Sequence, residues 1–150
     1  MKGFTLIETL IVIAVLAIIT TIGTLSFSNS KARKTVAIIS NNIVFSLEEA
    51  KADAISGKGG VGHGIKFNST SYVTFDGDTY NLSDTDNITH DLESGYSLDI
   101  TTTDPDDSVV FSRITGDVND EITITVGETN NPSNSKVISV GALGDINVVQ

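Results

Sequence analysis

The chain begins MKGFTLIETLIVIAVLAIITTIGTL, residues 1–25, and this segment is almost wholly apolar from Phe4 to Leu25. At a rise of about 1.5 Å per residue, residues 4–25 would form a helix of about 33 Å, enough to cross the hydrocarbon core of a bilayer. Lys2 precedes the segment, and the positive-inside rule keeps a basic N-terminus in the cytoplasm. We therefore predict one membrane-spanning helix, with the rest of the chain outside the cytoplasm.

Glu8 is an acidic side chain inside this apolar segment, where an unpaired charge costs about 2.5 kcal/mol or more. An ordinary signal peptide has an uninterrupted apolar core followed by a small-x-small cleavage site, and residues 20–25 contain no such site. Glu8 therefore needs a cationic partner. In an isolated monomer, the alternative is that its carboxylate reaches up to water.

The short motif around Glu8 carries a family resemblance: Lys2-Gly3-Phe4-Thr5-Leu6-Ile7-Glu8 resembles the processing site of type IV prepilins and type II secretion pseudopilins. The resemblance implies that a prepilin peptidase cuts after Gly3 and that Phe4 becomes the N-methylated first residue. It also implies storage in the bacterial cytoplasmic (inner) membrane and assembly with other pilin or pseudopilin subunits into a filament. There the amine of Phe4 on a neighbouring subunit would neutralise Glu8 and fix the register. Gly3 would leave the backbone open to the peptidase.

The rest of the chain reads as a helix followed by a β-rich domain. We expect a leader at residues 1–3, a membrane and filament-core helix at 4–25, an amphipathic helix at 26–56 and a soluble head at 57–150. Apolar residues recur at steps of three and four within the amphipathic helix and predict a stripe that packs on a sheet. They are Val36, Ile39, Ile43, Leu47, Ala50 and Ala54. Glycines from Gly57 onward should end the helix.

Beyond residue 61, short runs rich in β-branched and aromatic residues alternate with turn residues, which predicts antiparallel sheet. The expected strands are 64–67, 72–75, 96–101, 109–114, 122–126, 137–140 and 146–149. Turns are expected at 68–70, 76–78, 104–107 and 130–133. The predicted fold class is α+β: a long N-terminal helix packed on an antiparallel head, as in pilins.

Within that family, the second half of the helix, residues 62–76 and residues 140–146 are similar to the GspH/FimT-like minor subunits. This resemblance implies a head of two sheets and a place near the filament tip. The chain departs from related proteins in having no basic C-terminal cluster of the kind linked with DNA capture. It also has no cysteine pair to close a C-terminal loop.

The charge of the chain is unevenly distributed. Its net charge is −10, with seven Lys or Arg against four Asp or Glu in residues 1–66, and two against fifteen in residues 67–150. Nucleic-acid binding depends on cations, so we expect no nucleic-acid partner for the acidic head. The cations Lys31, Arg33 and Lys34 follow the membrane segment and suit either lipid headgroups or salt bridges to an acidic neighbour.

Residues that could carry chemistry are few. There are no cysteines, and the two histidines, His63 and His90, belong to no catalytic motif, so we predict no enzyme and no cofactor. His63 between two glycines is expected to be a strand or turn residue. Acidic loops offer weak calcium ligands, with solvated turns as the alternative. They are Asp117, Asn119 and Glu121, and the nearby Asp104, Asp106 and Asp107.

These observations favour a structural pilin or pseudopilin subunit without turnover of its own. One alternative is a tip binding module or adhesin that captures a secreted protein or a surface. Another is a minor pilin for DNA uptake, and a third is an unrelated single-pass anchored domain. The expected partners are other subunits, the prepilin peptidase, the membrane and, in the second case, a secreted client.

Overall fold

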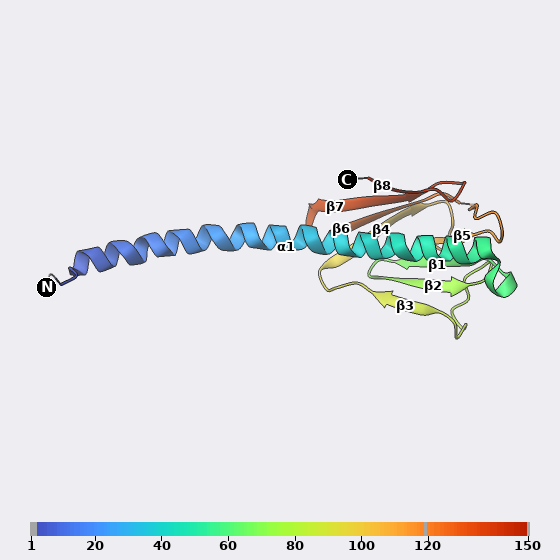
Figure 1. The fold of residues 1–150 in the computed structure, drawn as a ribbon, viewed down its shortest axis with the longest axis horizontal. Helices are drawn as coiled ribbons and strands as arrows, with labels where there is room; N and C mark the ends of the chain where they lie inside the picture. The colour runs from blue at the N-terminus through green and yellow to red at the C-terminus, as the bar shows by residue number, and fades with distance from the viewer. Residues whose placement is uncertain (1–2, 119, 150) are drawn as a thin grey trace. The chain divides into compact units, whose positions relative to one another are not determined.

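The computed structural model describes residues 3–118 and 120–149, without the side chains of residues 21–29 (Figure 1). The chain divides into two compact units, Met1–Lys34 and Thr35–Gln150. The helices are α1 (Leu6–Ser56) and a short 3-10 helix, η1 (Lys58–Gly60). The strands are β1 (His63–Asn68), β2 (Ser71–Asp76), β3 (Ile88–Asp91), β4 (Tyr96–Thr102), β5 (Ser108–Phe111), β6 (Ile122–Glu128), β7 (Asn131–Val140) and β8 (Ile146–Val149).

The first unit consists of the N-terminal part of α1. Between Phe4 and Ile19 its large apolar side chains are exposed, with Phe4 at 77% and Ile19 at 60%. Within the helical residues that the structure describes, no segment is both long and apolar enough to cross a membrane.

The second unit is built around the C-terminal part of α1. All six residues of the predicted stripe are buried, with Ile43, Leu47 and Ala54 fully so, which confirms the amphipathic pattern. Ile38 and Phe45 on the same helix are exposed. The helix ends at Ser56, and Gly57 follows in the left-handed conformation at φ 71°, which glycine adopts without a steric penalty.

Two four-stranded antiparallel sheets form the head. One sheet, which we call sheet A, has the order β3-β2-β1-β5, and the other, sheet B, has the order β4-β6-β7-β8. Apolar side chains of both sheets meet the stripe of α1 in a single core, which contains Phe67 and Phe111 from sheet A and Ile124 and Ile138 from sheet B. Figure 1 shows the C-terminal part of α1 lying along the strands of the head. The predicted α+β fold class, with a helix packed on antiparallel sheet, is confirmed.

Three details of the predicted sheet are wrong. Strand β3 was not expected, because its residues are largely exposed and carry no alternation. Strand β5 ends at Phe111, not at residue 114, because Ile114 has φ 75° and the chain turns there. Strand β7 begins at Asn131, inside the predicted turn at 130–133. The ladder with β6 shifts between Gly127 and Glu128, and this irregularity accommodates Pro132, which has no N–H to donate.

Candidate functional site

The first candidate site is the start of α1, where Thr5 and Glu8 bond to each other. The Glu8 N–H donates to Thr5 Oγ1 at 3.4 Å, and the Thr5 N–H donates to Glu8 Oε2 at 3.4 Å. The Thr5 hydroxyl also donates to Glu8 Oε2, at 3.3 Å. This reciprocal arrangement is a capping box, which satisfies two N–H groups that a helix start leaves unpaired. Within one chain, Glu8 is therefore positioned at the first turn of α1, which begins at Leu6.

The sequence reasoning missed this capping box, although the signal for it was present. Thr5-Leu6-Ile7-Glu8 has the spacing of a Ser or Thr followed three residues later by Glu. A negative charge in the first turn also interacts favourably with the helix dipole. Glu8 thus has a role inside its own chain, as the partner of Thr5 at the helix start.

Gly3 and Phe4 lie just before the helix, in an accessible segment. A Cβ added at Gly3 would meet no atom within 4 Å, and the backbone there is not left-handed. Phe4 is 77% exposed. Because packing within the described chain does not require glycine at position 3, a requirement for glycine would come from a molecule that binds this segment.

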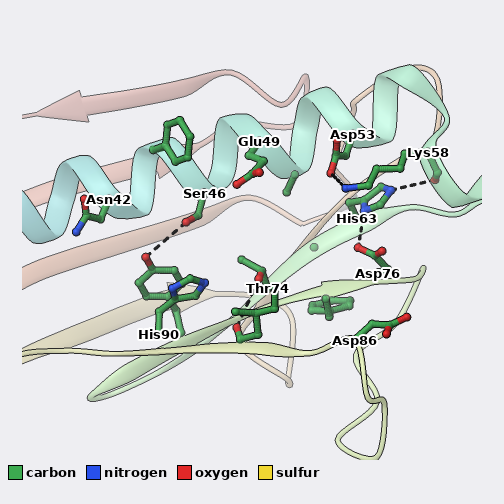
Figure 2. A pocket seen from close by; sticks show the side chains of 16 residues that line it. Asn42, Ser46, Glu49, Asp53, Lys58, His63, Thr74, Asp76, Asp86 and His90 are labelled. Carbon is green, nitrogen blue, oxygen red and sulfur yellow. Dashed lines mark hydrogen bonds and ion pairs between the residues drawn. The ribbon is translucent and has the colours of Figure 1, made fainter.

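The second candidate site is a groove in the head between α1 and sheet A (Figure 2). Its main cavity is about 400 Å³, and a neighbouring hollow of about 330 Å³ shares Asn42, Tyr72 and His90 with it. We call the two together the α1–sheet A groove. Its walls combine exposed apolar side chains with acidic ones. They include Phe45, Glu49, Asp53, Asp76, Asp86 and Ile88 from the main cavity, and Ile38, Asp91 and Glu93 from the hollow.

An aromatic pair lines the wall shared by both cavities. The rings of Tyr72 and His90 stack, with their centroids 4.7 Å apart and an angle of 13° between their planes. These residues are directly opposite each other on β2 and β3. The Ser46 hydroxyl on α1 donates to the Tyr72 hydroxyl at 3.4 Å. His90 is therefore held by stacking, and it became part of the site only through the unpredicted strand β3.

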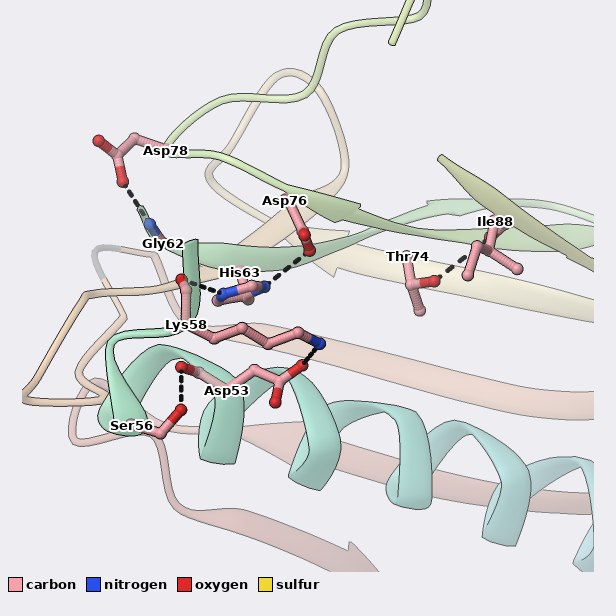
Figure 3. Close-up of polar contacts among 9 residues, drawn as sticks. All are labelled: Asp53, Ser56, Lys58, Gly62, His63, Thr74, Asp76, Asp78 and Ile88. Carbon is pink, nitrogen blue, oxygen red and sulfur yellow. Dashed lines mark hydrogen bonds and ion pairs between the residues drawn. The ribbon is translucent and has the colours of Figure 1, made fainter. Parts of the chain in front are cut away.

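His63 closes one end of the groove (Figure 3). Its Nδ1 lies 2.7 Å from Asp76 Oδ1, and its Nε2 lies 3.0 Å from the Lys58 carbonyl oxygen. The Lys58 carbonyl can only accept, so Nε2 is the donor of that hydrogen bond, and Nδ1 faces the Asp76 carboxylate. His63 is 2% exposed and is the first residue of β1. The expectation of a strand or turn residue is confirmed, and its side chain links η1 to β2.

Nearby, the Lys58 ammonium pairs with Asp53 at 2.5 Å on the surface. The hydrogen bond and the charge of Asp53 raise the pKa of Lys58 above its usual value. The sequence analysis missed the pairing of His63 with Asp76, although it could have been predicted. The two-residue loop between β1 and β2 places residue 63 opposite residue 76.

Two acidic loops contain the residues suggested as weak calcium ligands. Asn119 lies outside the described residues, and the Asp117 carbonyl accepts the Ser112 N–H at 2.8 Å. Among the residues that the structure describes, no three His, Cys, Asp or Glu side chains are grouped so as to hold a metal ion.

The Asp104 carboxylate organises the turn before β5. It accepts hydrogen bonds from the Asp106 N–H at 3.0 Å, the Ser108 N–H at 3.3 Å and the Ser108 hydroxyl at 2.5 Å. Partial burial raises the pKa of Asp104, but these hydrogen bonds and the charge of Lys66 outweigh it, so the pKa lies below its usual value. This carboxylate therefore serves as a turn acceptor.

Comparison with known proteins supports the motif and the fold separately. Residues 1–24 match the family model for the prokaryotic N-terminal methylation motif. The structure is similar to that of the minor pseudopilin EpsH from the Type 2 Secretion System of Vibrio cholerae, with 14% identity, a TM-score of 0.57, and coverage of 76% of this chain and 95% of that one. It is also similar to the type IV minor pilin FimU of Pseudomonas aeruginosa, with 13% identity, a TM-score of 0.57, and coverage of 82% and 91%. No curated protein matches the sequence. The chain thus combines an N-terminal methylation motif with a fold similar to that of a minor pseudopilin and a minor pilin.

Proposed function

We propose that this chain is a structural subunit of a type IV pilus or type II secretion filament, and that it has no catalytic activity of its own. The observation that carries the proposal is the methylation motif at residues 1–24, with Glu8 as the acidic residue in its apolar segment. The pilin-like fold of the head supports it, because the buried stripe of α1 packs on both sheets in one core.

In the proposed pathway, the chain first resides in the cytoplasmic membrane as a single-pass protein with its head outside the cytoplasm. The prepilin peptidase cuts after Gly3, and Phe4 becomes the methylated terminus. The exposure of both residues is compatible with access by an enzyme. The helix then leaves the lipid and packs against the helices of other subunits.

Pairing between subunits gives Glu8 its second role. Inside a bundle of helices, an unpaired carboxylate is costly, and a cationic amine on the neighbouring Phe4 offsets that cost. Since the amine exists only after cleavage at Gly3, uncut chains lack the partner. Processing would in this way control which chains assemble.

The first test is the mature N-terminus. Mass spectrometry of protein purified from membranes and from filaments should find N-methylated Phe4, and a Gly3→Leu variant should keep Met1. Natural protein that retains residues 1–3 in filaments, or that is cut after Leu25, would overturn the proposal.

The second test separates the two roles of Glu8. Glutamine can replace glutamate in a capping box but carries no charge, so Glu8→Gln keeps the helix cap and removes the ion pair. We expect Glu8→Gln and Glu8→Leu both to be processed and both to be lost from sheared filaments. Glu48→Gln, on the exposed surface of the same helix, is the matched control and should assemble normally. If Glu8→Gln assembles as well as the Glu48→Gln control, then Glu8 acts only as a helix cap, and its pairing with the amine of a neighbouring Phe4 is refuted.

A further inference from the structure

The α1–sheet A groove carries an excess of negative charge. Six carboxylates and one lysine line its two cavities. The lysine, Lys58, is paired with Asp53, and Asp76 is paired with His63. Neither Glu49 nor Asp86 forms an ion pair with any residue that the structure describes, and both are exposed. The groove therefore carries more acidic than basic side chains.

The walls between these carboxylates are apolar and exposed. Phe45 on α1 is 66% exposed, and Ile88 on β3 is 60% exposed. Figure 2 shows Glu49 projecting from α1 toward the sheet, with Asp86 on the opposite side of the groove. Aliphatic and aromatic walls with acidic rims suit a long cationic side chain, whose stem packs on the walls while its head reaches a carboxylate. A space of this size admits a few side chains and not a folded domain.

The same chain carries cations of that kind on α1. Lys31 and Lys34 are exposed, and within the described residues neither forms an ion pair. They lie one turn apart on the helix, so their side chains share a face. A second copy of this chain therefore offers the groove cationic side chains of the kind that suits it.

We propose that the α1–sheet A groove of one subunit binds the basic turn at residues 31–34 of α1 in a second copy of this chain. Lys34 enters between Phe45 and Ile88 and pairs with Glu49 or Asp86, while Lys31 meets Asp91 or Glu93 at the neighbouring hollow. The contact rests on the proposed function, because parallel assembly through the helices brings the α1 of one copy beside the head of another. It adds a second polar contact to the one at Glu8, outside the apolar segment.

Cysteine cross-linking tests this contact cleanly, because the natural chain has no cysteine. Two differently tagged full-length copies, one with Lys34→Cys and one with Glu49→Cys, are expressed together in cells that assemble the filament, and treated with a short bismaleimide. We expect a mixed-tag dimer whose linked peptides contain positions 34 and 49. The matched control pairs Lys34→Cys with Leu143→Cys, which is 76% exposed but lies outside the groove. The control should yield several-fold less dimer.

Exchanging the charges of Lys34 and Glu49 is a second test of this contact. Lys34→Glu and Glu49→Lys should each lower the amount of subunit in filaments several-fold, and the two substitutions together in one chain should restore it. If filaments form with Phe4 as the mature terminus but the 34–49 linkage is no stronger than the 34–143 linkage, this inference fails while the proposed function stands. Linkage of position 49 to a different protein would also overturn it. Chains that keep residues 1–3 in filaments would instead refute the proposed function.

Discussion

Replacing Gly144 with alanine tests how the C-terminal loop is held against the end of α1. Gly144 has φ 70°, and a Cβ there would lie 2.1 Å from the carbonyl oxygen of Gly116, a backbone atom that cannot rotate away. The Gly144 carbonyl also accepts a hydrogen bond from Lys51 Nζ on α1 at 2.8 Å. The substitution therefore strains the backbone, displaces the loop that contains Gly116 and weakens the bond to Lys51.

Two contributions set the expected size of the effect. A left-handed conformation costs a residue with a Cβ roughly 1–2 kcal/mol. Moving the loop and losing a partly exposed hydrogen bond from a charged group adds roughly 1–2 kcal/mol. We expect Gly144→Ala to lower the free energy of unfolding by about 2–4 kcal/mol. Each kcal/mol lost should lower the melting temperature by about 4 °C.

Gly60→Ala is the matched control for this change. Gly60 has φ 75°, close to the value at Gly144, but nothing lies within 4 Å of its added Cβ. It should lose only the conformational part, roughly 1–2 kcal/mol. Both variants would be compared by urea unfolding of the full-length protein in detergent, followed by circular dichroism. Equal losses in the two variants would refute the reasoning, because the close approach of Gly144 to Gly116 would then have no energetic consequence.

Three further predictions concern the head, and each is measured by unfolding of the same full-length protein. Leu47→Ala should lower the free energy of unfolding by about 3 kcal/mol, because Leu47 is fully buried. The control Phe45→Ala should change it by less than about 0.5 kcal/mol, because Phe45 is 66% exposed. Similar losses in the two variants would contradict the assignment of the buried face. His63→Leu should cost about 1–2 kcal/mol, because it removes the ring that bonds to the Lys58 carbonyl and to Asp76. Asp76→Asn should cost less, since an amide oxygen can still accept a hydrogen bond, and the reverse order would argue against a structural role for the His63 ring. The pKa of Asp104 is lowered in the folded state, so its carboxylate contributes stability above about pH 4 that is lost as the pH falls through the folded pKa. The Asp104→Asn variant should therefore lose less stability than the natural protein between about pH 5 and 2. An unchanged pH dependence of stability in this variant would count against the contribution of Asp104.

Local patterns were sufficient for the helix and for the N-terminal motif. The stripe from Val36 to Ala54 could be read from spacing alone, because burial of one helix face follows the 3.6-residue period. Gly57 could be identified as the stop because few other residues adopt its conformation readily. Gly3, Phe4 and Glu8 were identified by the resemblance of seven consecutive residues to a family motif, and their roles stay a prediction.

Only the tertiary structure decided the edges of the sheets and the groove. Strand β3 has an exposed, irregular pattern, and it is a strand because β2 offers it hydrogen bonds. That pairing brings His90 onto Tyr72 and places Ile88 and Asp86 across from α1, although these residues are some forty positions away from Glu49 in the chain. The periodicity of the sequence predicts which face of a helix or strand is buried. Which strands become neighbours depends on contacts between residues far apart in the chain, and a local sequence pattern does not predict these contacts.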